Sequence, residues 1–253
     1  MRAFPDESFP LAHSRARLAE FAAPTAAEFD FLVSLAGPVQ QVARRRTIRR
    51  EGDRPQSVYL LAEGWVLSSM TLPDGSRQIV KIHLPGDMLG SPSVGLEAAA
   101  ETLTTLTPVK LRTLGLPALG SLFTRAPHLA ALMFLSAQQE RLILMDRLCS
   151  VARTSAECRL AGLLVHLHDR LKIITPGIGP RFDHPLTQEQ IGDVIGLTSV
   201  HVNRVFRMLE DRGLILRDGH SIELLNMPVL RKLCGVPAKL PARDLSWLTE
   251  PLT

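Results

Sequence analysis

The chain has 253 residues, of which 45% are hydrophobic and 21% are charged. This length favours one or two domains, and the apolar fraction is typical of a globular protein, not of a charge-rich disordered segment. Lysine and arginine total 29 against 25 aspartates and glutamates, an excess that permits nucleic-acid binding without requiring it. The sequence shows no signal-peptide core and no run of the roughly 20 apolar residues that a membrane helix needs. We therefore expect a cytoplasmic protein that does not enter a membrane.

The three cysteines are Cys149, Cys158 and Cys234. They are odd in number and lie far apart, with no CxxC pair and no nearby histidine at metal-ligand spacing. This pattern argues against a disulfide framework and against a zinc site.

The first predicted elements are a helix over about 25–35, with Thr25 and Glu28 in capping-box positions, and a β-rich block from residue 47 to about 116. In this block short apolar runs alternate with glycine-containing turns, which predicts an antiparallel sandwich or barrel. The runs lie at 58–61, 65–70, 78–83 and 109–114.

Two local features of the β-rich block give sharper predictions. Asp74-Gly75 predicts a hairpin with a type I′ turn, whose two central residues both need a positive φ. The arginines at 44–46 and 49–50 suggest either an acidic partner or a solvated strand face, and the second is the commoner situation.

After Pro127, the stretch to about residue 150 lacks glycine and proline and predicts one long helix. Apolar residues recur along it at intervals of three, four and seven, which makes one stripe. The stripe consists of Leu132, Leu135, Leu142, Met145 and Cys149. It can pack against a second copy of the chain, as in a short coiled coil, or against the chain's own β domain, and the spacing does not separate the two.

A second helix is expected from about 155 to 171, and a glycine- and proline-rich stretch at 175–180 ends it. Thr187 and Gln190 then form a capping box for a short helix that Gly196 stops, and Thr198 can cap the next helix. Two short helices joined by a tight glycine-containing turn are typical of a helix-turn-helix. The apolar residues of the second helix recur on one face: Val202, Val205, Phe206 and Leu209.

The opposite face of that second helix is expected to enter the major groove of DNA. Arg204 has the donor fork for guanine O6 and N7, Asn203 can offer an amide pair to adenine, and Val200 can touch a thymine methyl. Arg207 lies on the same face. Residues near the helix starts are better placed for phosphate, because exposed N–H groups there favour anions. These are Thr187, Thr198, Ser199 and His201.

Downstream, apolar runs at 214–216 and 222–225 flank Arg217-Asp218-Gly219-His220. This arrangement predicts a hairpin with a basic tip, so Arg217 is a further candidate DNA contact and the domain is a winged helix. The alternative is a helical subdomain in which Arg204 and Arg207 are merely solvated, a common outcome for an isolated helix-turn-helix match.

The segment 186–215, with Ile191-Gly192 before the turn and Arg204 in the second helix, resembles the DNA-binding domain of the Crp/Fnr regulators. Glycine turns at 51–53, 61–64, 74–75 and 85–87 resemble the effector domain of the same family. The resemblance implies an α+β fold in three parts. These are a jelly-roll-like antiparallel β-roll for effector sensing with an N-terminal helix at 1–126, a dimerisation helix and hinge at 127–153, and a winged helix-turn-helix with a C-terminal tail at 154–253.

The same resemblance implies a transcription regulator that binds a two-fold symmetric operator in double-stranded DNA as a homodimer. By this similarity Ser199, Val200 and Arg204 occupy the positions of the principal base contacts. An unknown small-molecule effector and RNA polymerase are the further partners that it suggests.

The chain departs from the family at its sensing sites. Cyclic-nucleotide members have a Gly-Glu-Leu run followed by an Arg-Ser pair, whereas here 90–96 is GSPSVGL and 98–104 contains no arginine. A buried phosphate would lack its charge-assisted partner, so cyclic AMP is not expected. An iron–sulfur centre is not expected either, because no cysteine precedes Cys149. His83, the one histidine in the predicted barrel, is more often an ordinary surface or hydrogen-bonded residue than a haem ligand.

Enzymatic activity is not expected. The barrel lacks the two histidines and carboxylate of a metal site, and the chain has no GxSxG, Walker A or GxGxxG motif. The remaining functional alternative is a ligand-sensing β-roll that regulates through protein contacts without specific DNA binding.

Overall fold

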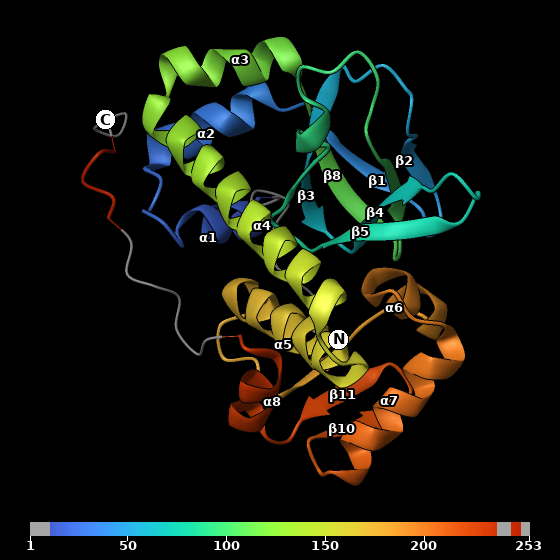
Figure 1. The fold of residues 1–253 in the computed structure, drawn as a ribbon. Helices are drawn as coiled ribbons and strands as arrows, with labels where there is room; N and C mark the ends of the chain where they lie inside the picture. The colour runs from blue at the N-terminus through green and yellow to red at the C-terminus, as the bar shows by residue number, and fades with distance from the viewer. Residues whose placement is uncertain (1–10, 237–243, 249–253) are drawn as a thin grey trace. The chain divides into compact units, whose positions relative to one another are not determined.

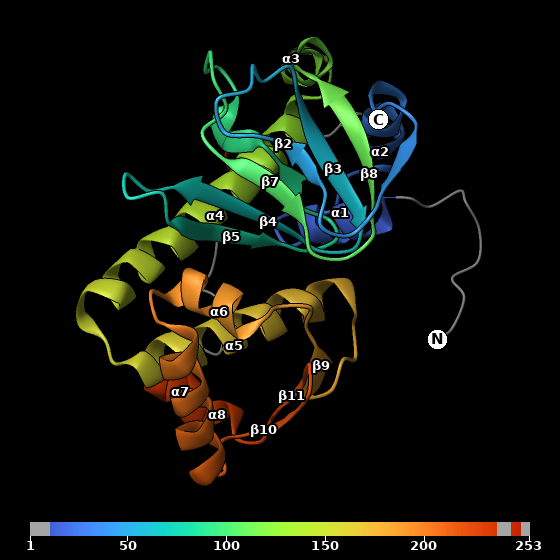
Figure 2. The ribbon, with the colours of Figure 1, turned by 90° about the vertical axis from the view of Figure 1, so that its right-hand side faces the viewer.

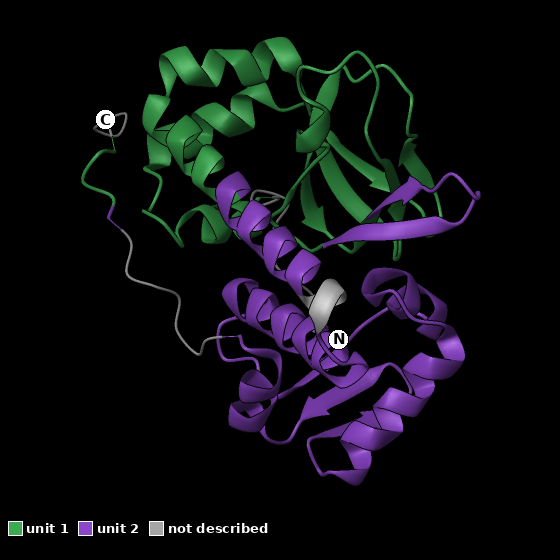
Figure 3. Cartoon of the chain, viewed as in Figure 1, with its two compact units in different colours: residues 1–67, 83–136, 245–253 green, residues 68–82, 137–244 purple. Residues whose placement is uncertain are grey.

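The computed structural model describes residues 11–236 and 244–248 (Figure 1). Contacts divide the chain into two compact units, one of residues 1–67, 83–136 and 245–253, the other of residues 68–82 and 137–244 (Figure 3). The boundary therefore falls inside the long helix, and the second unit also includes a β-hairpin.

The first unit begins with two helices, α1 (Ala12–Leu18) and α2 (Ala26–Leu35). The predicted capping box of α2 is confirmed: the amide of Glu28 donates to Thr25 Oγ1 at 3.2 Å, and the Glu28 carboxylate accepts from the amide of Thr25 at 2.9 Å. Glu28 is fully buried and its other oxygen lies 2.9 Å from His128 Nδ1. The cap thus also joins α2 to the start of the long helix.

The β-roll consists of two four-stranded sheets, with strand orders β1-β8-β3-β6 and β2-β7-β4-β5 (Figure 2). In the first sheet β8 lies antiparallel between β1 and β3. The four predicted strands are confirmed as β3, β4, β5 and β8. The strands are β1 (Val39–Val42), β2 (Thr47–Arg49), β3 (Ser57–Glu63), β4 (Val66–Thr71), β5 (Arg77–His83), β6 (Met88–Leu89), β7 (Thr102–Thr105) and β8 (Val109–Gly115).

Strand β3 is buried on both faces because it lies between two apolar layers. Val58 and Leu60 pack against helices, in a cluster that also contains Leu32 of α2. Leu61 points the other way, into a cluster with Leu111 and other residues of the two sheets. The helical layer is completed by α3 (Leu116–Arg125) and by the start of α4 (Pro127–Arg153).

The type I′ prediction for Asp74-Gly75 is wrong. Gly75 has a φ of 81°, but among the described residues Arg45 alone of the non-glycines has a positive φ, so Asp74 does not. The amide of Gly75 donates to the carbonyl of Leu72 at 2.9 Å. Pro73 occupies the second position, where its fixed φ favours a type I turn followed by a left-handed glycine.

The second unit contains a central helix, α5, that contacts α6, α7 and α8, and a three-stranded sheet of order β10-β11-β9. Its core includes Leu164 of α5, Phe206 of α7 and Ile222 of β11, each at most 1% exposed. The elements are α5 (Ala156–Ile174), β9 (Arg181–Asp183), α6 (Gln188–Ile195), α7 (Ser199–Asp211), β10 (Ile215–Asp218), β11 (Ser221–Leu224) and α8 (Met227–Cys234). The predicted hairpin at 214–225 therefore gains a third strand, β9, which pairs with β11.

Within the described residues, no single helix is long and apolar enough to cross a membrane. Helix α3 and the part Pro127–Cys149 of α4 reach that length and composition only together, and a bend of 118° separates them.

Candidate nucleic-acid interface

The helix-turn-helix is built from the local signals that the sequence predicts. Thr187 caps α6 in a capping box with Gln190, and Thr198 Oγ1 accepts from the amide of His201 at 3.3 Å to cap α7. Gly196 ends α6 in the left-handed conformation, with a φ of 69°. Each end of α6 and the start of α7 is thus fixed by residues that lie within four positions of it.

Gly192 determines how closely the turn packs on α6. A Cβ built on Gly192 would lie 2.3 Å from the carbonyl oxygen of Leu197. That atom belongs to the backbone of the turn, so it cannot rotate away. The close approach of the two helices therefore requires glycine at position 192.

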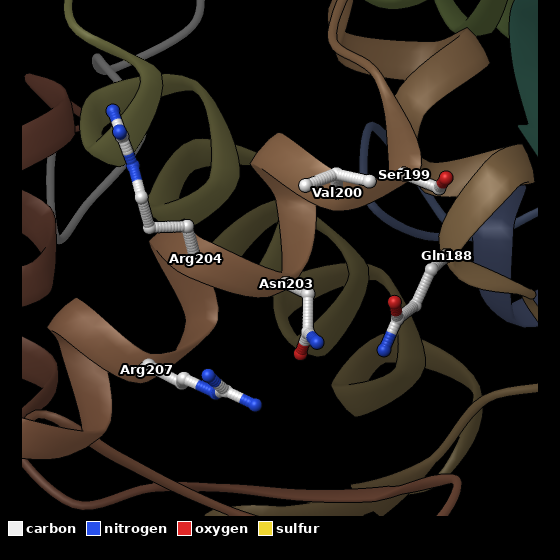
Figure 4. Close-up of a pocket in the computed structure, with 6 residues that line it drawn as sticks. All are labelled: Gln188, Ser199, Val200, Asn203, Arg204 and Arg207. Carbon is white, nitrogen blue, oxygen red and sulfur yellow. The ribbon is translucent and has the colours of Figure 1, made fainter.

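Helix α7 separates an apolar inner face from a polar outer face, as predicted. Its inner residues Val202, Val205, Phe206 and Leu209 are each at most 1% exposed, whereas Val200 is 80% exposed. The outer face lines an open groove of about 380 Å³, together with the first residue of α6 (Figure 4). The residues that line it are Gln188, Ser199, Val200, Asn203, Arg204 and Arg207.

Arg204 and Arg207 are the cations of this groove. Both are exposed, and among the described residues neither forms an ion pair. The guanidinium of Arg204 lies 3.5 Å from His201 Nε2, and the side chains of Arg204 and Arg207 extend away from the helix (Figure 4). Two guanidinium groups with open donors on one helix face can bind base edges or phosphate oxygens.

Gln188 is a groove residue that the sequence interpretation did not select. Its amide and that of Asn203 extend into the same space (Figure 4). The available signal was its position directly after the cap Thr187, at the exposed start of α6. Thr187 and Thr198 are exposed, but their hydroxyl groups already accept the capping hydrogen bonds, so each retains a donor.

Arg217 lies on strand β10, directed toward α7 and not at the tip of the hairpin. Side chains alternate along β10, so Arg217 shares its face with the buried Ile215. Its guanidinium lies 4.6 Å from the centre of the Phe206 ring and 3.4 Å from the Glu210 carboxylate. Both terminal nitrogens donate to Asn203 Oδ1 at 3.3 Å.

Arginines from other helices hold the C-terminal end of α6. Arg147 of α4 donates to the carbonyl of Val194 at 2.8 Å, and Arg159 of α5 donates to the carbonyl of Ile195 at 2.9 Å. Burial lowers the pKa of Arg147. Arg77 of the β4–β5 hairpin adds an ion pair of 2.6 Å with Asp193. Arg147 and Arg159 satisfy carbonyls at the negative end of the helix dipole, Arg77 pairs with a carboxylate there, and together they fix the first helix of the motif.

Helix α4 presents exposed apolar residues beyond its first turns. Leu142 is 62% exposed and Met145 51% exposed, Cys149 is also exposed, and Leu135 is half-buried. Leu132, by contrast, is fully buried in the core of the first unit. The start of the stripe therefore packs within the chain, and its continuation is exposed.

An arginine from another part of the β-roll reaches the stretch 90–104, which was expected to have none. Arg49 of β2, which is 6% exposed, donates to Ser93 Oγ at 3.0 Å and lies 3.7 Å from the carboxylate of Glu101. A solvated strand face is therefore wrong for this residue. A Cβ on Gly90 would lie 2.8 Å from Arg49 Nη1, so glycine permits this packing.

These residues do not fit a cyclic nucleotide. A phosphate brought to the Arg49 guanidinium would lie beside the buried carboxylate of Glu101, and the two negative charges would repel each other. His83 is 2% exposed, and its Nδ1 lies 3.7 Å from the Asp87 carboxylate. Within the described residues no three His, Cys, Asp or Glu side chains form a possible metal site.

A β-roll joined by a long helix to a helix-turn-helix with a three-stranded wing defines a class of protein, the sensor-linked DNA-binding regulators. A family model described as Crp-like helix-turn-helix domain matches residues 158–233, and one described as Cyclic nucleotide-binding domain matches residues 39–126. The chain belongs to the Crp/Fnr family and is a DNA-binding transcription regulator, not an enzyme.

Two relatives support this assignment. The chain is 32% identical to the nitrogen fixation regulation protein FixK of Rhizobium meliloti, over 75% of this chain and 84% of that protein. It is 34% identical to the transcriptional activatory protein AadR of Rhodopseudomonas palustris, over 70% of this chain and 72% of that protein. The structure of FixK2 from Bradyrhizobium japonicum is similar in fold, with a TM-score of 0.69 and 24% identity over 78% of this chain and 96% of that one.

Proposed function

We propose that the protein binds a two-fold symmetric operator as a homodimer, with α7 of each copy in the major groove. The observation that supports this most is the outer face of α7, where Arg204 and Arg207 have no ion-pair partner among the described residues and line an open groove. Arg204 is the proposed base contact, because its fork can donate to guanine O6 and N7. Val200 and Ser199 are its proposed neighbours at the bases.

The backbone contacts of the proposal come from residues at the helix starts. Thr187, Thr198 and His201 lie where amide groups and the helix dipole favour phosphate. Such contacts set the position of the protein on DNA without selecting sequence. Arg207, further along α7, is proposed to contact phosphate at the edge of the groove.

The proposed dimer seam is the exposed part of α4. Leu135, Leu142, Met145 and Cys149 continue at heptad spacing along it, and the exposed fractions of Leu142 and Met145 are large for a helix that remains solvated. Leu132 is outside this seam because the core of the first unit buries it. A dimer about α4 would present two copies of α7 to half-sites one helical turn apart, roughly 34–36 Å.

The proposed cellular setting is the cytoplasm, with RNA polymerase as a further partner. The proposed control comes from a small-molecule effector at the β-roll that is not a cyclic nucleotide, because Glu101 already engages Arg49 there. The relative AadR is named a transcriptional activatory protein, which favours a productive contact with polymerase.

Binding-site selection from random DNA tests the proposal, carried out in parallel on the wild type and on Arg204→Ala. The wild type is expected to enrich a two-fold symmetric motif. Arg204→Ala is expected to lose about 1–3 kcal/mol of specific binding and to relax preference at one symmetric pair of positions. Thr187→Val, the matched control at a phosphate contact, is expected to weaken binding to all sequences alike. Identical motifs from the wild type and Arg204→Ala would refute the assignment of Arg204.

A further inference from the structure

The side-chain amide of Asn203 already has a hydrogen-bond partner at its oxygen in the absence of DNA. Its Oδ1 lies 3.3 Å from both Nη1 and Nη2 of Arg217. A guanidinium has only donors, so it determines which end of the amide is the oxygen. The nitrogen Nδ2 is then the end that remains for other partners, and the Asn203 side chain lines the groove of α7 (Figure 4).

Arg217 is itself fixed by two further contacts. Its guanidinium stacks on the ring of Phe206, at 4.6 Å from the ring centre, and Phe206 is 1% exposed. Glu210 supplies the balancing charge at 3.4 Å. Asn203, Phe206 and Glu210 are spaced by three and four residues, so they form one ridge of α7 along which the Arg217 side chain lies. A side chain held by a stack, an ion pair and two hydrogen bonds loses little further entropy when DNA binds.

We propose that Arg217 is a positioning residue that makes Asn203 a donor-only base contact, an inference that rests on the proposed DNA recognition by α7. An asparagine that recognises adenine uses both ends of its amide, accepting from N6 and donating to N7. Here Oδ1 already accepts from both terminal nitrogens of Arg217, which compete with adenine N6 for this oxygen, so the adenine pairing is disfavoured. The two N–H groups of Nδ2 instead favour a keto base, guanine with its O6 and N7 acceptors or thymine with O4.

This assignment changes the roles of two predicted contacts. Asn203 selects guanine or thymine and disfavours cytosine, whose major-groove edge has only the N4 donor. Arg217 does not contact phosphate. It acts on specificity through Asn203, from strand β10, and its loss should change which base is preferred as well as how tightly DNA is bound.

The test compares motifs selected by the full-length wild type, Asn203→Ala, Arg217→Met and Arg181→Met. Asn203→Ala identifies the symmetric pair of positions that Asn203 contacts. At those positions the wild type is expected to prefer a keto base over adenine, and Arg217→Met is expected to reduce this preference at least about fivefold, since it frees Oδ1. Methionine keeps the apolar stem over Phe206. Arg181→Met, which removes a cation of the same sheet that pairs with Asp218, leaves the Arg217–Asn203 contact in place and is expected to keep the wild-type motif.

Asn203→Asp keeps the proposal falsifiable if Arg217→Met fails to fold. Its carboxylate retains Arg217 as partner but has no donor, so the keto preference should disappear and cytosine should gain. An unchanged motif from Arg217→Met, or a wild-type preference for adenine at these positions, would overturn the inference while leaving operator binding intact. If the wild type enriches no symmetric motif at all, the proposed function fails and the inference fails with it.

Discussion

Replacing Gly192 by alanine tests whether the turn of the helix-turn-helix depends on backbone contact. The added Cβ would lie 2.3 Å from the carbonyl oxygen of Leu197, a separation that requires the turn to open. Gly162 of α5 provides the matched control, because its Cβ would meet only the Cβ of Cys234, at an ordinary 3.5 Å.

Two effects of opposite sign decide the outcome. Alanine stabilises a helix interior by about 1 kcal/mol relative to glycine, and this stabilisation applies at both positions. Forcing a methyl group into a closely packed site costs about 1–3 kcal/mol, and the high end applies to Gly192 because the opposing atom is backbone. Gly192→Ala should therefore lose about 1–2 kcal/mol of stability in the second unit, while Gly162→Ala stays neutral or becomes slightly more stable.

Two measurements on the full chain separate these cases. Hydrogen exchange of the α6 and α7 amides should accelerate in Gly192→Ala and remain as in the wild type in Gly162→Ala. Affinity for the selected operator, measured by fluorescence anisotropy, should fall at least about tenfold for Gly192→Ala, since the two helices must keep their relative angle to fit the major groove. Wild-type exchange and wild-type affinity in Gly192→Ala would refute the reasoning.

Three further predictions concern pH, assembly and the β-roll. Burial lowers the pKa of His184 to about 4, so the neutral side chain stabilises the fold fully above its ordinary pKa of 6.5, and this stability is lost as the pH falls toward 4. At pH 5 the free energy of unfolding of the wild type, measured by thermal unfolding, should therefore have fallen by about 2 kcal/mol more than that of His184→Asn. Leu142→Asp combined with Met145→Asp should give monomers in sedimentation, and a persistent dimer would remove α4 from the seam. Arg49→Met should cost the first unit about 3–5 kcal/mol in denaturation followed by tryptophan fluorescence, because Glu101 is left buried without its cation, and adding Glu101→Gln should restore much of it.

The parts of the site that the sequence predicted correctly depend on near neighbours. Thr187, Gln190, Gly196 and Thr198 define helix ends through contacts that span at most four residues. The inward stripe of α7 is equally local, since it follows from a fixed 100° per residue. Such rules hold whatever the rest of the chain does, and so the helix-turn-helix was predictable in detail.

The parts that were missed depend on distant residues. Arg49 meets Ser93 and Glu101 across more than forty positions of sequence, through pairing of β2 with β7 that short strands do not signal. The type I′ prediction at Asp74 is wrong for a local reason instead, because Pro73 fixes the turn type. Arg217 was assigned to the hairpin tip because the sequence did not fix which strand position would face α7.

The charge of the DNA-binding region shows why arrangement decides binding here. Residues 180–233 contain seven lysines and arginines and seven acidic residues, so the region has no net attraction for DNA by count. In the part of the chain that the structure describes, several of these cations are neutralised by ion pairs with acidic residues, whereas those on the outer face of α7 are not. Ion pairs engage Arg181, Arg212, Arg217 and Arg231. Because the described residues offer no such partner to Arg204 or Arg207, the positive charge of a neutral domain is concentrated where the groove opens. Placing an acidic residue one helical turn from Arg204 would give this arginine an ion-pair partner and should abolish specific binding without unfolding the domain. The salt dependence of operator affinity would measure the change.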